Sequence, residues 1–184
     1  MILTNVRLNW VKVERPDDKG KYGVCILVPK NSPAAETLLQ AKNLALKKGI
    51  ETQKFSKAQS MASNFRAGIR DGDEEAKTGQ QPEYYKGHWF INASNVSQPG
   101  VVDENNLPAN PNIIYSGCIA HVDINVFPYF NQEKNARGIT ASIENIMFRE
   151  HAERLDGRPT PKPATDAFAA FAPESEETPD NDMF

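Results

Sequence analysis

The sequence predicts a mainly β fold: a five-stranded antiparallel barrel with a helix-containing insertion between its second and third strands. Three observations favour this fold, namely short segments of alternating polarity, one strong helix-start signal and a change of composition near the C-terminus. The 184 residues, 39% hydrophobic and 24% charged, are typical of one globular domain with a tail. We expect the domain to span residues 1–157 and the tail to span residues 158–184.

The first strand is predicted over residues 2–13, and a turn-rich loop over residues 14–21 follows it. Apolar and polar residues alternate along this strand with a period of two, which is typical of a half-buried strand. The predicted buried side holds Val6, Leu8 and Trp10, and the predicted exposed side holds Arg7 and Asn9.

The second strand and the first helix have clear boundaries. Residues 22–29 (YGVCILVP) are apolar at almost every position, which indicates a strand buried on both faces. Ser32 and Pro33 then suit the N-cap and the first position of a helix. We expect this helix to end at Gly49, which suits a C-cap.

The rest of the insertion is predicted to hold a short helical piece over residues 56–68 and a loop over residues 69–87. The third strand follows over residues 88–95 (HWFINASN), where Trp89 is expected in the core. Residues 98–112 are rich in turn-forming residues and predict an irregular connection.

A long hairpin supplies the last two strands, over residues 114–130 and 139–148, joined by a loop over residues 131–138. Its first strand alternates strongly, with Cys118, Ala120, Val122, Ile124 and Val126 on one face and His121, Asp123, Asn125, Phe127 and Tyr129 on the other. Five antiparallel strands with one helical insertion fit the OB-fold, a barrel that often binds nucleic acids.

The polar face of this hairpin contains a candidate nucleic-acid site. Phe127 and Tyr129 lie on it near the turn, and Lys134 and Arg137 are in the adjoining loop. Aromatic rings stack on unpaired bases of any sequence, while cations contact the phosphates. The alternative is that these rings pack under the insertion helices or form a dimer interface.

Two further clusters combine aromatic and basic residues. Tyr85 stands beside Tyr84 and Lys86 in the loop before the third strand, where we expect both rings to be free to stack. The other cluster surrounds the loop between the first two strands, which borders the binding groove of an OB barrel. Its members are Trp10, Lys12, Arg15, Lys19, Lys21 and Tyr22. Each cation taken singly also suits an ordinary solvated surface.

Signatures of catalysis and of cofactor binding are missing from the sequence. We find no Cys-x-x-Cys, no His-x-x-x-His, no phosphate-binding Gly-x-x-x-x-Gly-Lys-Ser/Thr and no Gly-x-Ser-x-Gly. We therefore expect no enzyme, no cofactor and no metal site. A metal-dependent nuclease that uses acids such as Asp123 and Glu144 is kept as an alternative.

The compartment follows from what surrounds the cysteines and from the lack of targeting segments. Cys25 and Cys118 each lie in an apolar stretch, so we expect them to be buried and reduced. No apolar run approaches the roughly 18–20 residues of a membrane span. The first ten residues lack the features of a signal peptide. These features predict a reducing cytoplasm and no membrane partner.

The tail separates charge from the domain. The chain has 21 bases and 24 acids, and five of those acids lie in residues 173–184, which leaves 21 − 19 = +2 for the rest. Residues 158–184 are rich in Pro and Ala and are predicted to be disordered. The candidates for partner binding there are Glu176, Glu177, Asp180, Asp182, Met183 and Phe184. The remaining acid, Glu174, is not one of these candidates. The alternative is that the tail only aids solubility.

Several stretches together resemble the single-stranded-DNA-binding proteins of tailed bacteriophages. They are PEYYKGHWFINASN, QPGVVD, YSGCIAHVDINVFPYF and GITASIENIMF, and the resemblance covers roughly residues 1–158 plus the acidic tail. It implies an OB-fold protein without catalytic activity that coats single strands at replication forks and recombination sites, in the cytoplasm of an infected bacterium.

The same resemblance implies a role for the tail. The ring of Phe184 would enter an apolar pocket on a replication or recombination protein, such as a polymerase, helicase-primase or nuclease, while the acids meet a basic rim. The acids could also mimic phosphates in the protein's own groove. A homodimer is a further expectation, and an adaptor that binds proteins but no DNA is the alternative.

Overall fold

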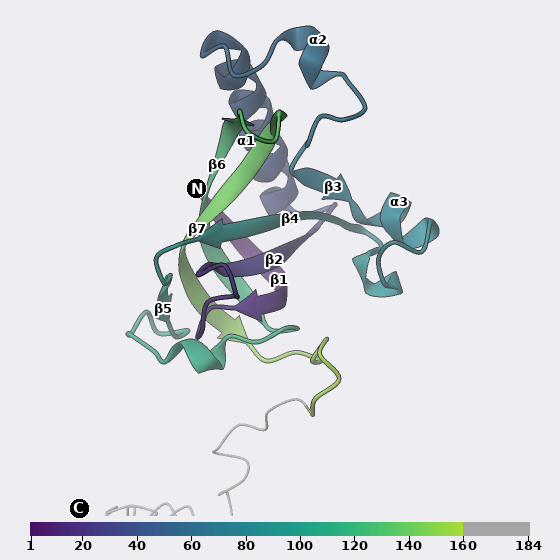
Figure 1. Cartoon of the computed structure of the whole chain (residues 1–184). Coiled ribbons are helices and arrows are strands. Elements are labelled where there is room, and N and C mark those ends of the chain that lie inside the picture. Colours follow the sequence, from purple (N-terminus) through teal and green to yellow (C-terminus); the bar gives the residue numbers. More distant parts are fainter. Residues whose placement is uncertain (160–184) are drawn as a thin grey trace, which may run out of the picture.

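The computed structural model describes residues 1–159, so every prediction about residues 160–184 lies outside the described part of the chain. Seven strands form one sheet in the order β3-β4-β2-β1-β6-β7-β5 (Figure 1). They are β1 (Ile2–Lys12), β2 (Tyr22–Pro29), β3 (Ile69–Asp71), β4 (His88–Asn95), β5 (Gly100–Val102), β6 (Ile119–Asn131) and β7 (Ala136–Glu150). The helical segments are α1 (Pro33–Glu51), α2 (Lys57–Ser60), α3 (Gly72–Lys77), η1 (Glu83–Tyr85) and η2 (Pro111–Ile113).

The sheet closes into a barrel because β4, which pairs with β2, also meets β7. This pairing is parallel and places Ala93 beside Ala141. The barrel strands are β1, β2, β4, β6 and β7, and β3 and β5 are short additions at the sheet's ends. α1, α2 and α3 lie between the second and third barrel strands in the chain. The predicted OB-fold barrel with its helical insertion is therefore confirmed.

The second strand is buried on both faces, as predicted. Val24, Ile26 and Val28 belong to the main core inside the barrel. Cys25 and Leu27 point the other way and pack with Tyr85 and Phe90 in a second, smaller core. Cys25 and Cys118 are both free and buried, which confirms that prediction. None of the helices in residues 1–159 is long and apolar enough to cross a membrane.

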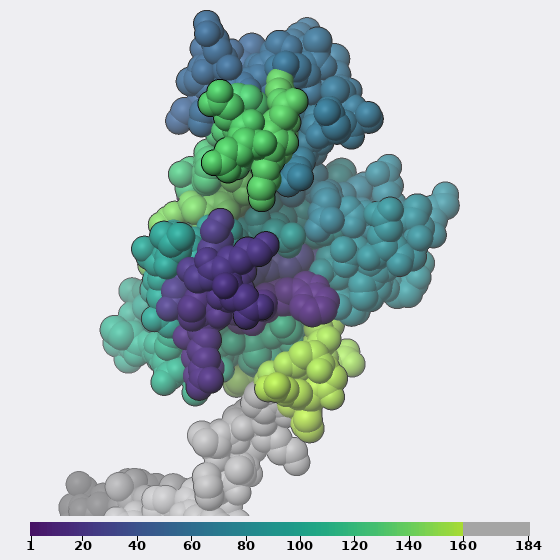
Figure 2. Space-filling view, viewed as in Figure 1, coloured from purple at the N-terminus to yellow at the C-terminus, as the bar shows by residue number. Residues whose placement is uncertain are grey.

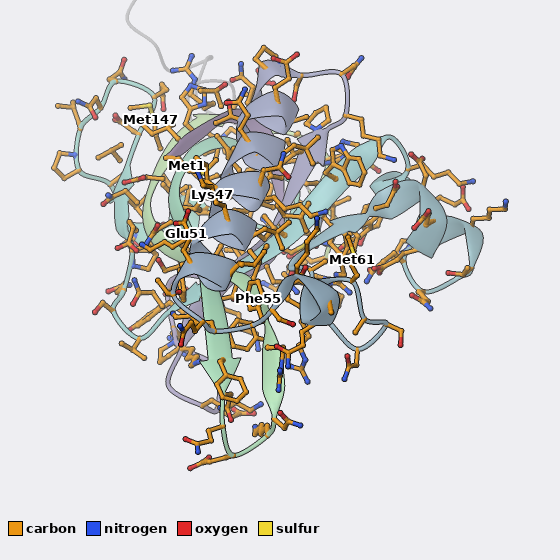
Figure 3. The ribbon with its side chains drawn as sticks, turned by 90° about the horizontal axis from the view of Figure 1, so that it is seen from above. Met1, Lys47, Glu51, Phe55, Met61 and Met147 are labelled. Atoms are coloured by element: carbon orange, nitrogen blue, oxygen red, sulfur yellow. The ribbon has the colours of Figure 1, made fainter. Side chains whose placement is uncertain are left out.

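The first helix begins where it was predicted and ends later. The Ser32 hydroxyl accepts a hydrogen bond from the Ala35 N–H, and Pro33 occupies the first turn. The helix continues past Gly49 to Glu51, so the prediction that Gly49 caps it was wrong. A Cβ at Gly49 would lie 2.1 Å from the ring of Phe55, so this glycine serves close packing instead. Figure 3 shows Phe55 beside this end of α1.

Several boundaries in the connections also differ from the predictions. The predicted helical piece over residues 56–68 is reduced to α2, and the predicted loop over residues 69–87 contains β3, α3 and η1. These elements are too short to produce a periodic pattern. Contacts outside them hold them in place: the ammonium group of Lys30, after β2, binds the carboxylates of Asp71 and Asp73.

The later connections differ in the same way. Residues 98–112 contain β5 and the start of η2 rather than only irregular chain. β6 begins at Ile119 instead of residue 114, and β7 begins at Ala136, which makes the hairpin turn shorter than expected. The hairpin consequently extends beyond the barrel as a long two-stranded arm, green in Figure 1.

Candidate nucleic-acid interface

The hairpin places two predicted aromatic residues on the outer face of the barrel. Phe127 pairs with Thr140, and Tyr129 pairs with Gly138. The residues between them on β6 and β7, including Pro128 and Ile139, are buried, whereas the Phe127 and Tyr129 side chains are half-exposed. The predicted alternation of β6 thus holds in this region.

A segment from the insertion lies against the same strands. We call residues 65–70 the strap. The Arg66 N–H donates to the carbonyl of Arg137 at 3.1 Å, and the Ile139 N–H donates to the carbonyl of Arg66 at 2.8 Å. Further along, the Ile69 end of the strap pairs with β4. The strap therefore fills the space between β4 and the arm where the two diverge.

The strap, β4 and the arm enclose a groove of about 710 Å³, which we call the hairpin groove. Two arginines and no carboxylate line it, and it contains both a phenol and a phenyl ring. Its lining residues are Phe65, Arg66, Ala67, Gly68, Arg70, Asn92, Tyr129, Ile139 and Thr140. This combination suits an anionic strand that carries flat, apolar bases.

Contacts with neighbouring side chains fix the groove's walls. The ring of Phe65 packs edge-on against Phe55, with centroids 5.0 Å apart. The guanidinium of Arg70 lies 4.3 Å from the ring centre of Phe90 and 3.4 Å from a carboxylate oxygen of Glu75. Side chains outside the strap therefore hold both of its ends in place.

Sequence reasoning missed Phe65, Arg66 and Arg70 as groove residues. The available signal was the alternation of Arg66, Gly68 and Arg70 with the apolar Ala67 and Ile69. Two arginines and one glycine are too few to distinguish a strand from a loop.

Lys134 and Arg137 lie at the outer end of the arm rather than in the lining of the hairpin groove. Lys134 is in the turn, where its N–H donates to the side chain of Asn131. The guanidinium of Arg137 lies 4.9 Å from the ring centre of Phe130. In Figure 2 the arm's tip and the dark purple residues near the start of the chain stand on opposite sides of the hollowed front face.

The structure departs from the predicted burial at the end of β1. Asn9, predicted to be exposed, is only 3% exposed, and Trp10, predicted to be buried, is 68% exposed. The pairing of β1 with β2 is irregular between Asn9 and Lys12, which indicates a β-bulge. A bulge inserts one extra residue and so turns Trp10 away from the core, whereas Asn9, still in register opposite Cys25, stays on the outer face and is covered there by Tyr84 and Tyr85.

Trp10 borders a second groove of about 680 Å³, which we call the Trp10 groove. Lys12 and Arg15 line it, as do Tyr115, Arg154 and Arg158. Its basic and acidic lining residues are equal in number, since Glu14, Asp17, Asp18 and Asp156 also line it.

Two of these four acids are engaged in local contacts. The carboxylate of Asp17 accepts the N–H groups of Lys19 and Lys21, and the bond from Lys21 is the main cause that lowers the pKa of Asp17. Arg154 binds Asp156 through two N–H groups and lowers the pKa of that carboxyl to about 2. These contacts leave Lys12, Arg15 and Arg158 as the cations of this groove without an ion pair among the described residues.

The prediction that Tyr85 is free to stack on a base was wrong. Its ring is 1% exposed and packs edge-on against Phe90, with centroids 4.8 Å apart. Burial raises the pKa of Tyr85, and it raises the pKa of the neighbouring Cys25 thiol to about 11. Tyr84 is half-buried beside Tyr85, and the ammonium group of Lys86 binds Glu83 on the surface of η1.

The remaining predicted residues lie near the loop between β1 and β2. Tyr22 is half-buried at the start of β2, opposite Asn95 of β4. Lys19 and Lys21 are exposed in the loop itself. Neither Tyr22 nor these two lysines line the hairpin groove or the Trp10 groove.

The two acids considered for a metal-dependent nuclease, Asp123 and Glu144, each make their own local contacts. Asp123 borders a mainly apolar groove of about 560 Å³ with Ile2 and Met147, and it accepts a hydrogen bond from Asn145. Glu144 accepts a hydrogen bond from the hydroxyl of Ser142. Within residues 1–159, no group of three His, Cys, Asp or Glu side chains is placed to hold a metal ion.

Solved structures of phage proteins share this fold. The single-stranded DNA-binding protein from bacteriophage Enc34, in complex with ssDNA, superimposes with a TM-score of 0.65 at 24% identity, covering 84% of this chain and 88% of that one. The single-stranded DNA-binding protein gp2.5 of bacteriophage T7 gives a TM-score of 0.54 at 14% identity, covering 97% and 95%. At these identities the likeness establishes the fold alone.

Comparison of the sequence identifies the family, which the shared fold alone does not. The protein p50 of Acyrthosiphon pisum secondary endosymbiont phage 1 is 28% identical over 168 residues, which cover 84% of this chain and 85% of p50. A family model described as the ssDNA-binding protein of Enterobacter phage Enc34 matches residues 1–183. Because that match covers almost the entire sequence, this chain belongs to the Enc34-type family of phage ssDNA-binding proteins.

Proposed function

We propose that this protein binds single-stranded DNA without reading its sequence and that the strand lies in the hairpin groove. The observation that supports this most is the pair of arginines, without a lining carboxylate, beside the outward rings of Tyr129 and Phe65. The family membership and the Enc34 protein's complex with ssDNA support the same ligand.

The arrangement favours a single strand for two physical reasons. Unpaired bases expose flat faces that stack on Tyr129 in the groove and on Phe127, which lies next to it on the same face of β6 but outside the groove's lining. A duplex hides those faces between neighbouring base pairs. Arg66 and Arg70 meet the phosphates and release counterions, so the affinity falls as salt rises. Neither interaction requires a chemical step, and we propose no catalytic role.

The direct test measures the fluorescence anisotropy of a labelled oligothymidine as the protein is added, at low and high salt. A duplex of equal length is the control. Saturable binding that is stronger for the single strand and weaker at high salt is the expected result. Equal affinity for the duplex, or no binding at low salt, would refute the proposal and favour the adaptor alternative.

Arg66→Ala provides a residue-level test of phosphate contact. We expect weaker binding and a decrease of about 0.7 in the steepness of the log K against log salt plot, because one single-strand phosphate contact is lost. Lys47→Ala is the matched control, since Lys47 is an exposed cation of α1 that pairs with Glu51 at 3.9 Å (Figure 3). An unchanged slope for Arg66→Ala would exclude Arg66 from the interface.

We further propose that coating takes place during replication, recombination and repair, in the cytoplasm of the infected bacterium. The support is the family membership together with the two free, buried cysteines. Homodimer formation stays a prediction, and sedimentation of the full chain with and without oligothymidine tests it.

The acidic segment is proposed to have two ligands. Its acids, with Met183 and Phe184, would bind a replication or recombination protein through an apolar pocket with a basic rim. In the absence of that partner, the acids would compete with DNA for Arg66 and Arg70. The support is the charge of +2 outside residues 173–184 against five acids within them.

Removal of residues 173–184 is therefore expected to strengthen single-strand binding by about three- to tenfold at low salt and much less at high salt, where screening weakens charge competition. Oligothymidine anisotropy at both salts measures this. A full-length variant with its five acids changed to the matching amides is the control and should behave like the deletion. Unchanged affinity at low salt in both proteins contradicts the competition.

A further inference from the structure

The backbone of Trp10 adopts a conformation that bulky residues rarely take. Its φ is +49°, in the left-handed region, and its indole is 68% exposed. Burial of the ring therefore does not explain the conformation. Such a conformation persists only where the surroundings impose it, and it often accompanies a functional position.

The side chain of Asn9 imposes it. Its Oδ1 accepts the N–H of Trp10 at 2.8 Å, while its Nδ2 donates to the hydroxyls of Tyr84 at 3.2 Å and Tyr85 at 3.1 Å. Among the described residues, Asn9 is the one buried residue with an amide or charged side chain. Its amide thus joins the bulge of β1 to η1 through hydrogen bonds, of which the one to Tyr85 is buried.

The other end of this network is fixed as well. The Tyr85 hydroxyl lies 3.5 Å from the sulfur of Cys25 in β2. Beyond the indole, the Val11 N–H donates to the hydroxyl of Ser116 at 3.2 Å. The chain is therefore held on both sides of Trp10, and only the indole itself projects into solvent.

We infer that Asn9 is a positioning residue that holds the indole of Trp10 as a preformed stacking platform for an unpaired nucleobase at the edge of the Trp10 groove. This inference rests on the proposed function. A preformed ring loses little conformational freedom on binding, which improves affinity. Lys12, Arg15 and Arg158 are placed to meet the phosphates on either side of that base.

The inference gives the buried Tyr85 a role that differs from the one predicted for it. Tyr85 supports the stacking ring through Asn9 instead of stacking itself. It also separates two kinds of aromatic contact: Phe127 and Tyr129 lie in the regular pairing of β6 with β7, whereas Trp10 lies in a bulge of β1 that one buried amide maintains.

A double-mutant cycle tests this dependence. The chain has two tryptophans, so Trp89→Phe makes Trp10 the sole tryptophan, whose fluorescence is excited selectively over that of the tyrosines. In that background we expect Trp10→Ala to weaken oligothymidine binding about tenfold, as loss of one stacked base does. Asn9→Ala should weaken it about fivefold, and the double variant should bind within about twofold of Trp10→Ala. Asn43→Ala, an exposed asparagine of α1, is the matched control.

A second readout needs no DNA. If Asn9 holds the indole, Asn9→Ala will lower the fluorescence anisotropy of Trp10 in the free protein, whereas Asn43→Ala will not. Should Asn9→Ala fail to fold, Tyr85→Phe removes one partner of the Asn9 amide and is expected to lower the anisotropy by a smaller amount.

The outcomes separate the two proposals. Additive losses from Asn9→Ala and Trp10→Ala, or an unchanged indole anisotropy, would overturn the positioning role. Full affinity in Trp10→Ala would overturn the stacking platform while leaving the hairpin groove intact. Absence of single-strand binding by the parent protein would instead refute the proposed function itself.

Discussion

Replacing both Phe127 and Tyr129 with alanine is expected to weaken single-strand binding by well over tenfold while the barrel stays folded. Each ring that stacks on a base contributes about 1–3 kcal/mol, so the loss of two rings exceeds the 1.4 kcal/mol that corresponds to a tenfold change. Both side chains lie on the outer face, opposite Thr140 and Gly138, so their removal leaves no internal cavity. Oligothymidine anisotropy gives the affinity, and thermal unfolding gives the stability.

The same arm offers a matched control. Phe130 is 44% exposed at the end of β6 and pairs with Arg137 instead of facing the groove. Phe130→Ala removes an aromatic of the same size from the same strand, and we expect it to change the affinity by less than about twofold. If Phe130→Ala weakened binding as much as the double variant, or if the double variant bound normally, the strand would have to lie elsewhere.

The barrel was predictable because its long strands have strong periodic signals. Val122 and Ile124 in β6 alternate with less buried neighbours, and the apolar run of β2 matches its burial on both faces. Ser32 and Pro33 likewise fixed the start of α1, since a helix N-terminus is determined locally by its capping residues.

The misplaced residues depend on contacts between distant parts of the chain. Trp10 leaves the core face because of a bulge, and a bulge leaves no mark in a pattern of alternation, whereas Asn9 is buried on the outer face under η1. Tyr85 looked like a loop residue because its burial comes from Cys25 and Phe90, which lie on other strands. Local sequence cannot report either of these tertiary contacts.

The strap shows the same limit for the candidate site. Arg66 and Arg70 reach the groove because the strap bonds to β7 and then pairs with β4. Neither partner is near the strap in sequence. The basic residues predicted from local clusters were therefore those of the exposed loops, while the arginines of the hairpin groove were missed.

Gly138→Val is expected to detach the strap and thereby damage both stability and binding. A Cβ at Gly138 would lie 2.1 Å from the carbonyl oxygen of Arg66, so the backbone of one segment must move. That movement breaks the hydrogen bonds that Arg66 makes with Arg137 and Ile139. Overpacking and two lost backbone hydrogen bonds together predict a loss of about 3 kcal/mol in the free energy of unfolding.

The binding defect should be separable from the loss of stability. Ala136→Val adds the same kind of side chain two residues earlier on the same face of β7, where Ala136 is half-buried, and it should change both quantities little. At a temperature where Gly138→Val remains folded, we expect weaker oligothymidine binding and a smaller salt dependence, because Arg66 leaves the groove with the strap. A folded Gly138→Val protein with normal affinity and normal salt dependence would mean that the strap is dispensable for binding, and Arg66 would then have to be removed from the proposed interface.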